Sequence, residues 1–244
     1  MAQAEQWAMP TAPKPHPMRT KKPLAGMTTA MARCISMPPN ADTLTLVQWL
    51  SPAFPVGSYA YSQGLEQAIT DGHVTNAETL TDWITAILTH GSARMDAILL
   101  AHARTTDDLT DLAYALAPTA ERATEMREQG AAFTSVLTAL GYTQPPLPYA
   151  LALGHASRRL SLPTPDIIAH VLHALTAQLI SAAVRFVPLG AADGQRVLAT
   201  LTPLITTLAP LYATEPLEAL SSATSGADLA AMRHETLPVR IYRS

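Results

Sequence analysis

The sequence predicts an all-α protein, and three observations support this class. Hydrophobic residues make up 48% of the 244 residues but aromatic residues only 5%, so the core must consist largely of Ala, Leu, Ile and Val. Ala and Leu are strong helix formers and pack poorly as strands. Apolar residues recur at helical spacing, and no convincing strand-like alternation is found. We expect one helical bundle of roughly eight to ten helices over residues 41–244.

The first 40 residues differ from the rest in proline content and in charge. They contain seven prolines, which prevent a continuous helix. They also hold five of the 16 Lys and Arg residues but only one of the 19 acidic residues. We expect a disordered tail here. The alternative of a targeting peptide fits the basic charge, but the segment lacks a continuous apolar region and its prolines spoil an amphipathic transit helix.

In the first half of the helical region, prolines and glycines separate the expected helices. Pro52 ends the first helix, and Gly72 ends the second. Thr75 and Glu78 form a capping-box pattern at the start of the third, which carries an apolar stripe and ends at Gly91. The expected helices of this half are residues 44–50, 58–71, 75–90, 92–104 and 106–117.

In the second half of the helical region, prolines again separate the expected helices. Pro118 opens a long helix, and a proline-rich turn separates it from the next one. Thr164, Pro165 and Asp166 supply a capping hydroxyl, a first-turn proline and an anion at the positive end of a helix dipole. Pro188 ends that helix. The expected helices of this half are residues 118–141, 148–160, 164–187, 193–208 and 212–222.

Composition excludes several classes of chemistry. All three lysines lie in the first 22 residues, so the helical region has no lysine for a phosphate-binding loop or a Schiff base. The single cysteine, Cys34, rules out an internal disulfide framework. His170 and His173 lie three residues apart, but no Cys or carboxylate at an evident distance completes a metal site. We therefore expect no enzyme activity, cofactor or metal.

Two classes of partner are also disfavoured. The formal net charge is −3, and the region after the tail is acidic, whereas nucleic-acid binding requires a basic surface. No apolar run reaches the length needed to cross a bilayer. We expect neither a nucleic acid nor a membrane as partner.

One motif offers an enzymatic alternative. Asp107, Asp108 and Asp111 fit the DDxxD pattern with which all-α isoprenoid synthases hold Mg²⁺ and a diphosphate. Carboxylates four residues apart share a helix face, and hard cations prefer oxygen ligands. Acidic residues at a helix start also serve as ordinary capping groups, and no second Asp-rich segment follows. A Mg²⁺-dependent diphosphate enzyme thus remains the competing hypothesis.

Three segments carry residues that ordinary helix packing does not require. Residues 51–66 combine a loop fixed by two prolines with a helix containing Gly64, which costs about 1 kcal/mol in a helix interior and suggests close approach by another backbone. Residues 181–195 are rich in small residues that permit tight helix contact, with Arg185 alone in an apolar helix. Residues 232–244 mix aromatic, aliphatic and arginine side chains, as docking segments do.

These segments resemble the signatures of the urease accessory protein UreF family. The resemblance covers about residues 43–244, and residues 148–154 are similar to the family's central segment. Three motifs occur in family order at family-like spacing, namely residues 51–66, residues 181–190 with Gly194-Gln195, and residues 232–235 with 240–244. Residues 1–40 resemble nothing that we can name.

The resemblance implies an all-α, cytoplasmic, usually dimeric protein without chemistry of its own. Members of the family bridge a UreD (UreH) protein and the GTPase UreG, and the assembly loads nickel into apo-urease when GTP is hydrolysed. A generic helical scaffold with an unrelated partner is a third hypothesis. The residues that we expect to bind partners are Tyr59, Tyr61, Ser62, Gln63, Glu66, Arg185, Gln195, Arg233, His234, Arg240 and Arg243.

Two structural expectations follow from these segments. The C-terminal segment should pack back towards residues 51–66, with Arg240 reaching Tyr59, because a partly buried tyrosine hydroxyl needs a partner and arginine offers five donors. Residues 181–195 should contribute to a homodimer or to the surface that faces the GTPase. A purely structural role for Arg185 is the alternative.

Overall fold

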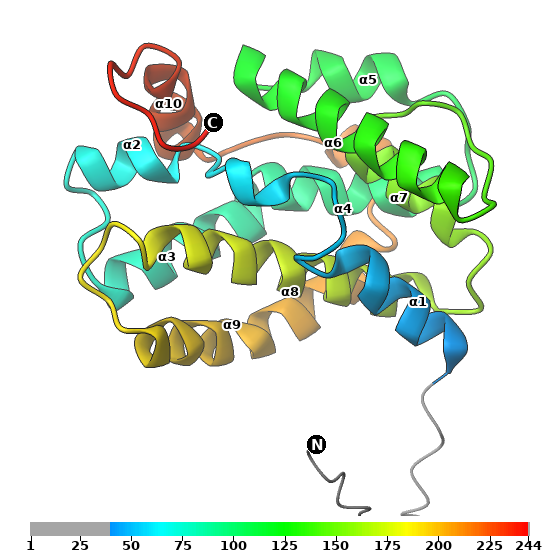
Figure 1. Cartoon of the computed structure of the whole chain (residues 1–244), viewed down its shortest axis with the longest axis horizontal. Coiled ribbons are helices and arrows are strands. Elements are labelled where there is room, and N and C mark those ends of the chain that lie inside the picture. The colour runs from blue at the N-terminus through cyan, green and yellow to red at the C-terminus, as the bar shows by residue number, and fades with distance from the viewer. Residues whose placement is uncertain (1–39, 244) are drawn as a thin grey trace, which may run out of the picture. The chain divides into compact units, whose positions relative to one another are not determined.

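The computed structural model describes residues 40–243. These residues form helices and no strand (Figure 1), which confirms the all-α class. The tail expected over residues 1–40 lies outside the described part of the chain, apart from its last residue. The elements are α1 (Ala41–Leu50), η1 (Ser58–Ala60), α2 (Leu65–Thr70), α3 (Ala77–His90), α4 (Ser92–Ala103), α5 (Thr110–Ala115), α6 (Ala120–Ala139), α7 (Tyr149–Ser157), α8 (Thr164–Ala183), α9 (Ala191–Tyr212), η2 (Leu217–Ala219) and α10 (Ser225–His234).

Helix α8 is the central element of the bundle. It packs along α9 and also contacts α1, α2, α3 and α4. Ile167, Ile168 and Leu179 are fully buried on it. Gly194 brings α9 close, because a Cβ there would lie 2.9 Å from Ile180 Cγ2. The small residues noted in the sequence thus permit the tight contact that they suggested.

Helix α8 also corrects one expectation. Among residues 40–243, it is the one helix long and apolar enough to cross a membrane by length and composition, so the statement that no apolar run has the required length was wrong. Of its apolar window, 44% is buried inside the bundle. Core helices of soluble proteins pass the same test, and α8 has the contacts of a core helix.

The second expected helix, residues 58–71, is interrupted. Gly64 has a φ of 79° and precedes α2 instead of lying inside a helix. The left-handed conformation, which glycine adopts without strain, ends the loop and lets α2 start at Leu65. The capping box is displaced by one residue from the expected pair, since Asn76 and Thr79 form it.

Other boundaries differ where proline or tertiary packing decides. Helix α9 continues through Pro210 to Tyr212, beyond its expected end at Leu208, because its buried stripe along α8 outweighs the missing backbone donor. The helix expected over residues 212–222 was wrong, since only the short η2 forms there. Helix α8 ends at Ala183, before the expected Val187. Helix α5 is shorter than expected, and α10 was not expected as a helix.

An aromatic cluster fixes the loop between α1 and α2. Phe133 of α6 makes ring contacts with Trp49, Phe54 and Tyr149, with centroids 5.8, 5.6 and 5.7 Å apart. Trp49 and Phe54 lie on either side of Pro52 in the chain, so the cluster anchors the end of α1 and the start of the loop against α6. The cluster thereby holds residues 51–64 in place. These residues are here called the proline loop.

Candidate functional site

The C-terminal end of the chain folds back onto the proline loop. Figure 1 shows the red end of the chain beside α2. The backbone N–H of Arg243 donates to the carbonyl of Ala60 at 2.7 Å. A Cβ at Gly64 would lie 2.7 Å from the backbone nitrogen of Ala231 in α10. Both expectations are confirmed: the C-terminal segment packs towards the first motif, and Gly64 permits close backbone approach.

Glu66 is the main receptor for residues 235–243, here called the C-terminal strap. Its carboxylate accepts the backbone N–H groups of Ile241 and Tyr242, both at 2.9 Å, and lies 3.1 Å from His234 Nε2. Burial alone would raise the pKa of Glu66, but these donors lower it below its ordinary value. The buried side chain therefore stays ionised and ties the strap to α2.

Arg240 has a different partner from the one expected. Its guanidinium lies 2.5 Å from Glu121 Oε1, and the other carboxylate oxygen of Glu121 lies 2.8 Å from His234 Nδ1. Tyr59 is 70% exposed, so its hydroxyl does not need a buried donor. The predicted contact between Arg240 and Tyr59 was therefore wrong, because a carboxylate is the stronger partner for a guanidinium.

A tyrosine–arginine contact forms instead between Tyr61 and Arg243, 3.5 Å apart. The Tyr61 hydroxyl donates to Glu128 Oε2 at 2.6 Å, and Arg243 also binds that oxygen, at 2.5 Å. Burial and the neighbouring Glu128 raise the pKa of Tyr61 to about 12. The phenol thus remains a neutral donor, and it joins the proline loop, α6 and the strap.

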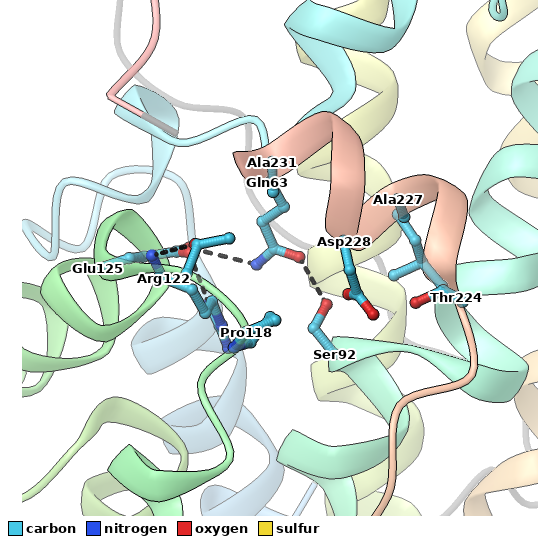
Figure 2. A pocket seen from close by; sticks show the side chains of 11 residues that line it. Gln63, Ser92, Pro118, Arg122, Glu125, Thr224, Ala227, Asp228 and Ala231 are labelled. Atoms are coloured by element: carbon cyan, nitrogen blue, oxygen red, sulfur yellow. Dashed lines mark hydrogen bonds and ion pairs between the residues drawn. The ribbon is translucent and has the colours of Figure 1, made fainter. Parts of the chain in front are cut away.

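A buried charge cluster lies under α10, formed by Asp96, Arg122 and Glu125. Glu125 is only 1% exposed and lies 2.6 Å from Arg122, which also pairs with Asp96. Figure 2 shows Gln63 reaching between Glu125 and Ser92. The sequence does not predict this cluster, because only the pair Arg122 and Glu125, three residues apart on α6, forms a helix pattern.

The remaining expected residues divide into two groups. Arg185 donates to the Tyr242 hydroxyl at 3.2 Å, and Arg233 lies 3.6 Å from Asp71. Ser62 is buried, and its hydroxyl accepts the N–H of Glu66. These residues join the strap site. Gln195 is exposed on α9 and is not part of it.

A largely apolar groove of about 600 Å³ adjoins the strap. Helices α1, α4, α6, α7 and α8, the proline loop and the strap all contribute to its walls. His170, His173 and Arg185 line it, together with the strap residue Tyr242. No group of three metal-ligating side chains is found within residues 40–243, so the two histidines do not have the partners that a metal site needs.

The aspartate motif does not form the arrangement that the enzymatic alternative requires. Asp107 and Asp108 precede α5, and Asp108 has a φ of 65°. Asp107 is 79% exposed and pairs with Arg158 at 2.7 Å. The expectation that Asp107 and Asp111 share a helix face was wrong, because the helix starts at Thr110.

The comparisons with known proteins agree with the sequence resemblance. Residues 74–202 match the family model described as UreF. A urease accessory protein UreF from Cereibacter sphaeroides strain ATCC 17029 is 54% identical over 209 residues, which cover 84% of this chain and all of that protein. UreF proteins of Paracoccus denitrificans and Dinoroseobacter shibae are 49% and 48% identical over 84% of this chain and over 98% and 99% of their own lengths. The chain therefore belongs to the UreF family of urease accessory proteins.

Proposed function

We propose that the chain is a cytoplasmic adaptor without catalytic activity that bridges a UreD/UreH-type protein and a UreG-type GTPase during urease maturation. In this role the GTPase supplies GTP hydrolysis, and the assembly delivers nickel to apo-urease. Membership of the UreF family supports a place in urease maturation. The observation that carries the adaptor role is the C-terminal strap, whose charged groups bind the body of the protein while its apolar side chains face outwards.

The exposed side of the strap has the composition of a binding surface. Val239 is 80% exposed and Ile241 is 69% exposed, and Met232 and Leu229 are exposed on the adjoining α10. Fixed apolar side chains bind partners at a low cost in conformational entropy. We assign this surface to the UreD/UreH-type partner.

Substitution of the exposed strap residues tests this assignment. The double variant Val239→Asp/Ile241→Asp should lose most of its capture of the UreD/UreH-type protein, because charges replace the centre of an apolar contact. Pull-down from cells that co-express both proteins measures the effect. Leu140→Asp is the matched control, since Leu140 is also exposed but lies just after the far end of α6. Equal capture by both variants would contradict the assignment.

The groove and the end of α8 are the proposed contact between two copies of the chain or with the GTPase. Arg185 lines the groove and donates to Tyr242. Arg185→Glu should therefore shift the chain towards monomer or weaken capture of the UreG-type GTPase, as measured by light scattering and pull-down. Arg196→Glu, on the exposed side of α9, is the control. An unchanged oligomeric state together with unchanged GTPase capture would leave Arg185 a structural role only.

Deletion of the gene tests the overall function. Urease activity should fall strongly in the deletion strain, and excess nickel should restore only part of it if the chain assists insertion. Copurification with the GTPase and apo-urease then separates this role from that of a generic helical scaffold. Normal urease activity in the deletion strain would overturn the proposal.

A further inference from the structure

His234 lies at the end of α10, fully buried between two carboxylates from different helices. Its Nδ1 lies 2.8 Å from Glu121 Oε2, and its Nε2 lies 3.1 Å from Glu66 Oε2. A neutral imidazole has one donor and one acceptor nitrogen, so it would turn a lone pair towards one of these carboxylates. An imidazolium ring donates to both. The geometry therefore fits a ring with a proton on each nitrogen.

When the His234 ring is charged, positive and negative groups around it are equal in number. Helix α2 contributes Glu66, helix α6 contributes Glu121, and the strap contributes Arg240, which lies 2.5 Å from Glu121 Oε1. Two carboxylates thus meet two cations when the ring is charged. With a neutral ring, the same groups would carry one unmatched negative charge in a buried place, which is costly.

Two further charged residues flank His234 in the chain. The carboxylate of Glu235 accepts the N–H of Ala120 at 2.9 Å, at the positive end of the α6 dipole. Arg233 pairs with Asp71 of α2 at 3.6 Å. Glu235 thus binds the N-terminus of α6, and Arg233 binds a carboxylate of α2, so neither of these charged groups is a partner of the ring.

We propose that His234 is a proton-operated clasp that holds the C-terminal strap against the bundle. The charged ring, at the end of α10, donates to Glu66 of α2 and to Glu121 of α6. These two carboxylates bind the strap through the amides of Ile241 and Tyr242 and through Arg240. Removal of one ring proton takes a donor from one of the carboxylates and so weakens its hold on the strap. The clasp is a property of the chain alone and does not rest on the partners proposed above. It makes the position of the exposed strap residues dependent on pH.

The hold of Glu66 on the strap should also weaken at low pH. The pKa of Glu66 is lowered in the folded chain by the donors from the strap, against the effect of burial. A lowered pKa contributes stability above the unfolded value, and this contribution is lost as the pH falls through the folded value. Closure of the strap should therefore be strongest at intermediate pH and should weaken towards both acid and alkali.

The first measurement reports the protonation state directly. We expect ¹⁵N spectra of the full chain, labelled at histidine, to show both nitrogens of His234 protonated at neutral pH. The His234→Gln variant assigns its signals. A neutral tautomer of His234 at neutral pH in the unaltered chain would overturn the proposal.

The second measurement reports the strap. The amides of Ile241 and Tyr242 donate to Glu66, so their hydrogen exchange, corrected for intrinsic rates, follows strap opening. Their protection should be highest at intermediate pH and should fall about tenfold in His234→Gln, the size of one lost hydrogen bond to a charged group. Exchange in α8 should stay unchanged, which separates opening of the strap from unfolding.

The control is His173→Gln, which removes an exposed histidine of α8. We expect this variant to keep the pH profile of the strap amides. A profile without an alkaline decline in the unaltered chain, or the same decline in His234→Gln, would show that another group controls the strap and would refute the clasp.

Discussion

Replacement of Arg122 by methionine is expected to destabilise the protein by about 3–5 kcal/mol, the cost of removing one partner from a buried ion pair. Arg122 is the cation that pairs with both Asp96 and Glu125, and its side chain is 11% exposed. Methionine keeps much of the side-chain volume but leaves both carboxylates without their cation. Urea unfolding followed by circular dichroism measures the change in free energy of unfolding.

The destabilisation should depend on pH in a defined direction. Burial raises the pKa of Asp96 even in the presence of Arg122, which acts to lower it. Without the guanidinium the pKa of Asp96 rises further, so the folded variant binds a proton that the unfolded chain binds only at lower pH. The difference between variant and unaltered chain should shrink as the pH falls.

Arg127→Met is the matched control for this experiment. Arg127 lies on the same helix, is exposed, and donates to a threonine hydroxyl instead of a carboxylate. Its replacement should change the free energy of unfolding by no more than about 0.5 kcal/mol. Equal effects of the two substitutions would mean that the buried charge cluster does not stabilise the fold.

The second large effect is expected at Gly130. A Cβ at this position of α6 would lie 2.0 Å from the carbonyl oxygen of Leu147 and 3.0 Å from the nitrogen of Tyr149. Both are backbone atoms, which cannot rotate away as a side chain can. Gly130→Ala should therefore destabilise the fold by about 3 kcal/mol or more, although alanine favours an isolated helix by about 1 kcal/mol.

Gly226→Ala serves as the control for Gly130→Ala. Gly226 lies in α10, and nothing is found within 4 Å of the position that its Cβ would take. The same chemical change should here be neutral or stabilising by up to about 1 kcal/mol. Thermal unfolding of both variants separates the effect of the close contact from the intrinsic preference for helix. A stable Gly130→Ala protein would show that α6 and the loop before α7 can separate.

Local signals in the sequence predicted the helices well where caps and prolines act alone. The end of α3 at Gly91 and the start of α8 at Thr164 lie where the sequence placed them. Tertiary packing decided the exceptions. Pro210 did not end α9, because the buried stripe of this helix lies along α8, and α10 forms where the sequence showed no clear apolar face.

The sequence predicted which segments form the candidate site, but it did not predict which residues pair within it. Residue composition indicated that the C-terminal end docks on the first motif. The partner of Arg240 was not predictable, because Glu121 lies 119 residues away in the sequence and nothing local marks it. Asp96 and Arg122 are likewise joined only by the packing of α4 and α6. Charges that meet across helices leave no periodic pattern in the chain.

Tyr242 belongs to two surfaces at once. It is a buried residue of the strap, its hydroxyl accepts from Arg185, its ring packs on Phe186, and it forms part of the groove wall. A molecule bound in the groove and a molecule bound to the strap would therefore both contact, or displace, the same side chain. Thermodynamic linkage makes their influence on each other mutual and equal in size. Any coupling between binding in the groove and binding at the strap would therefore pass through this single tyrosine.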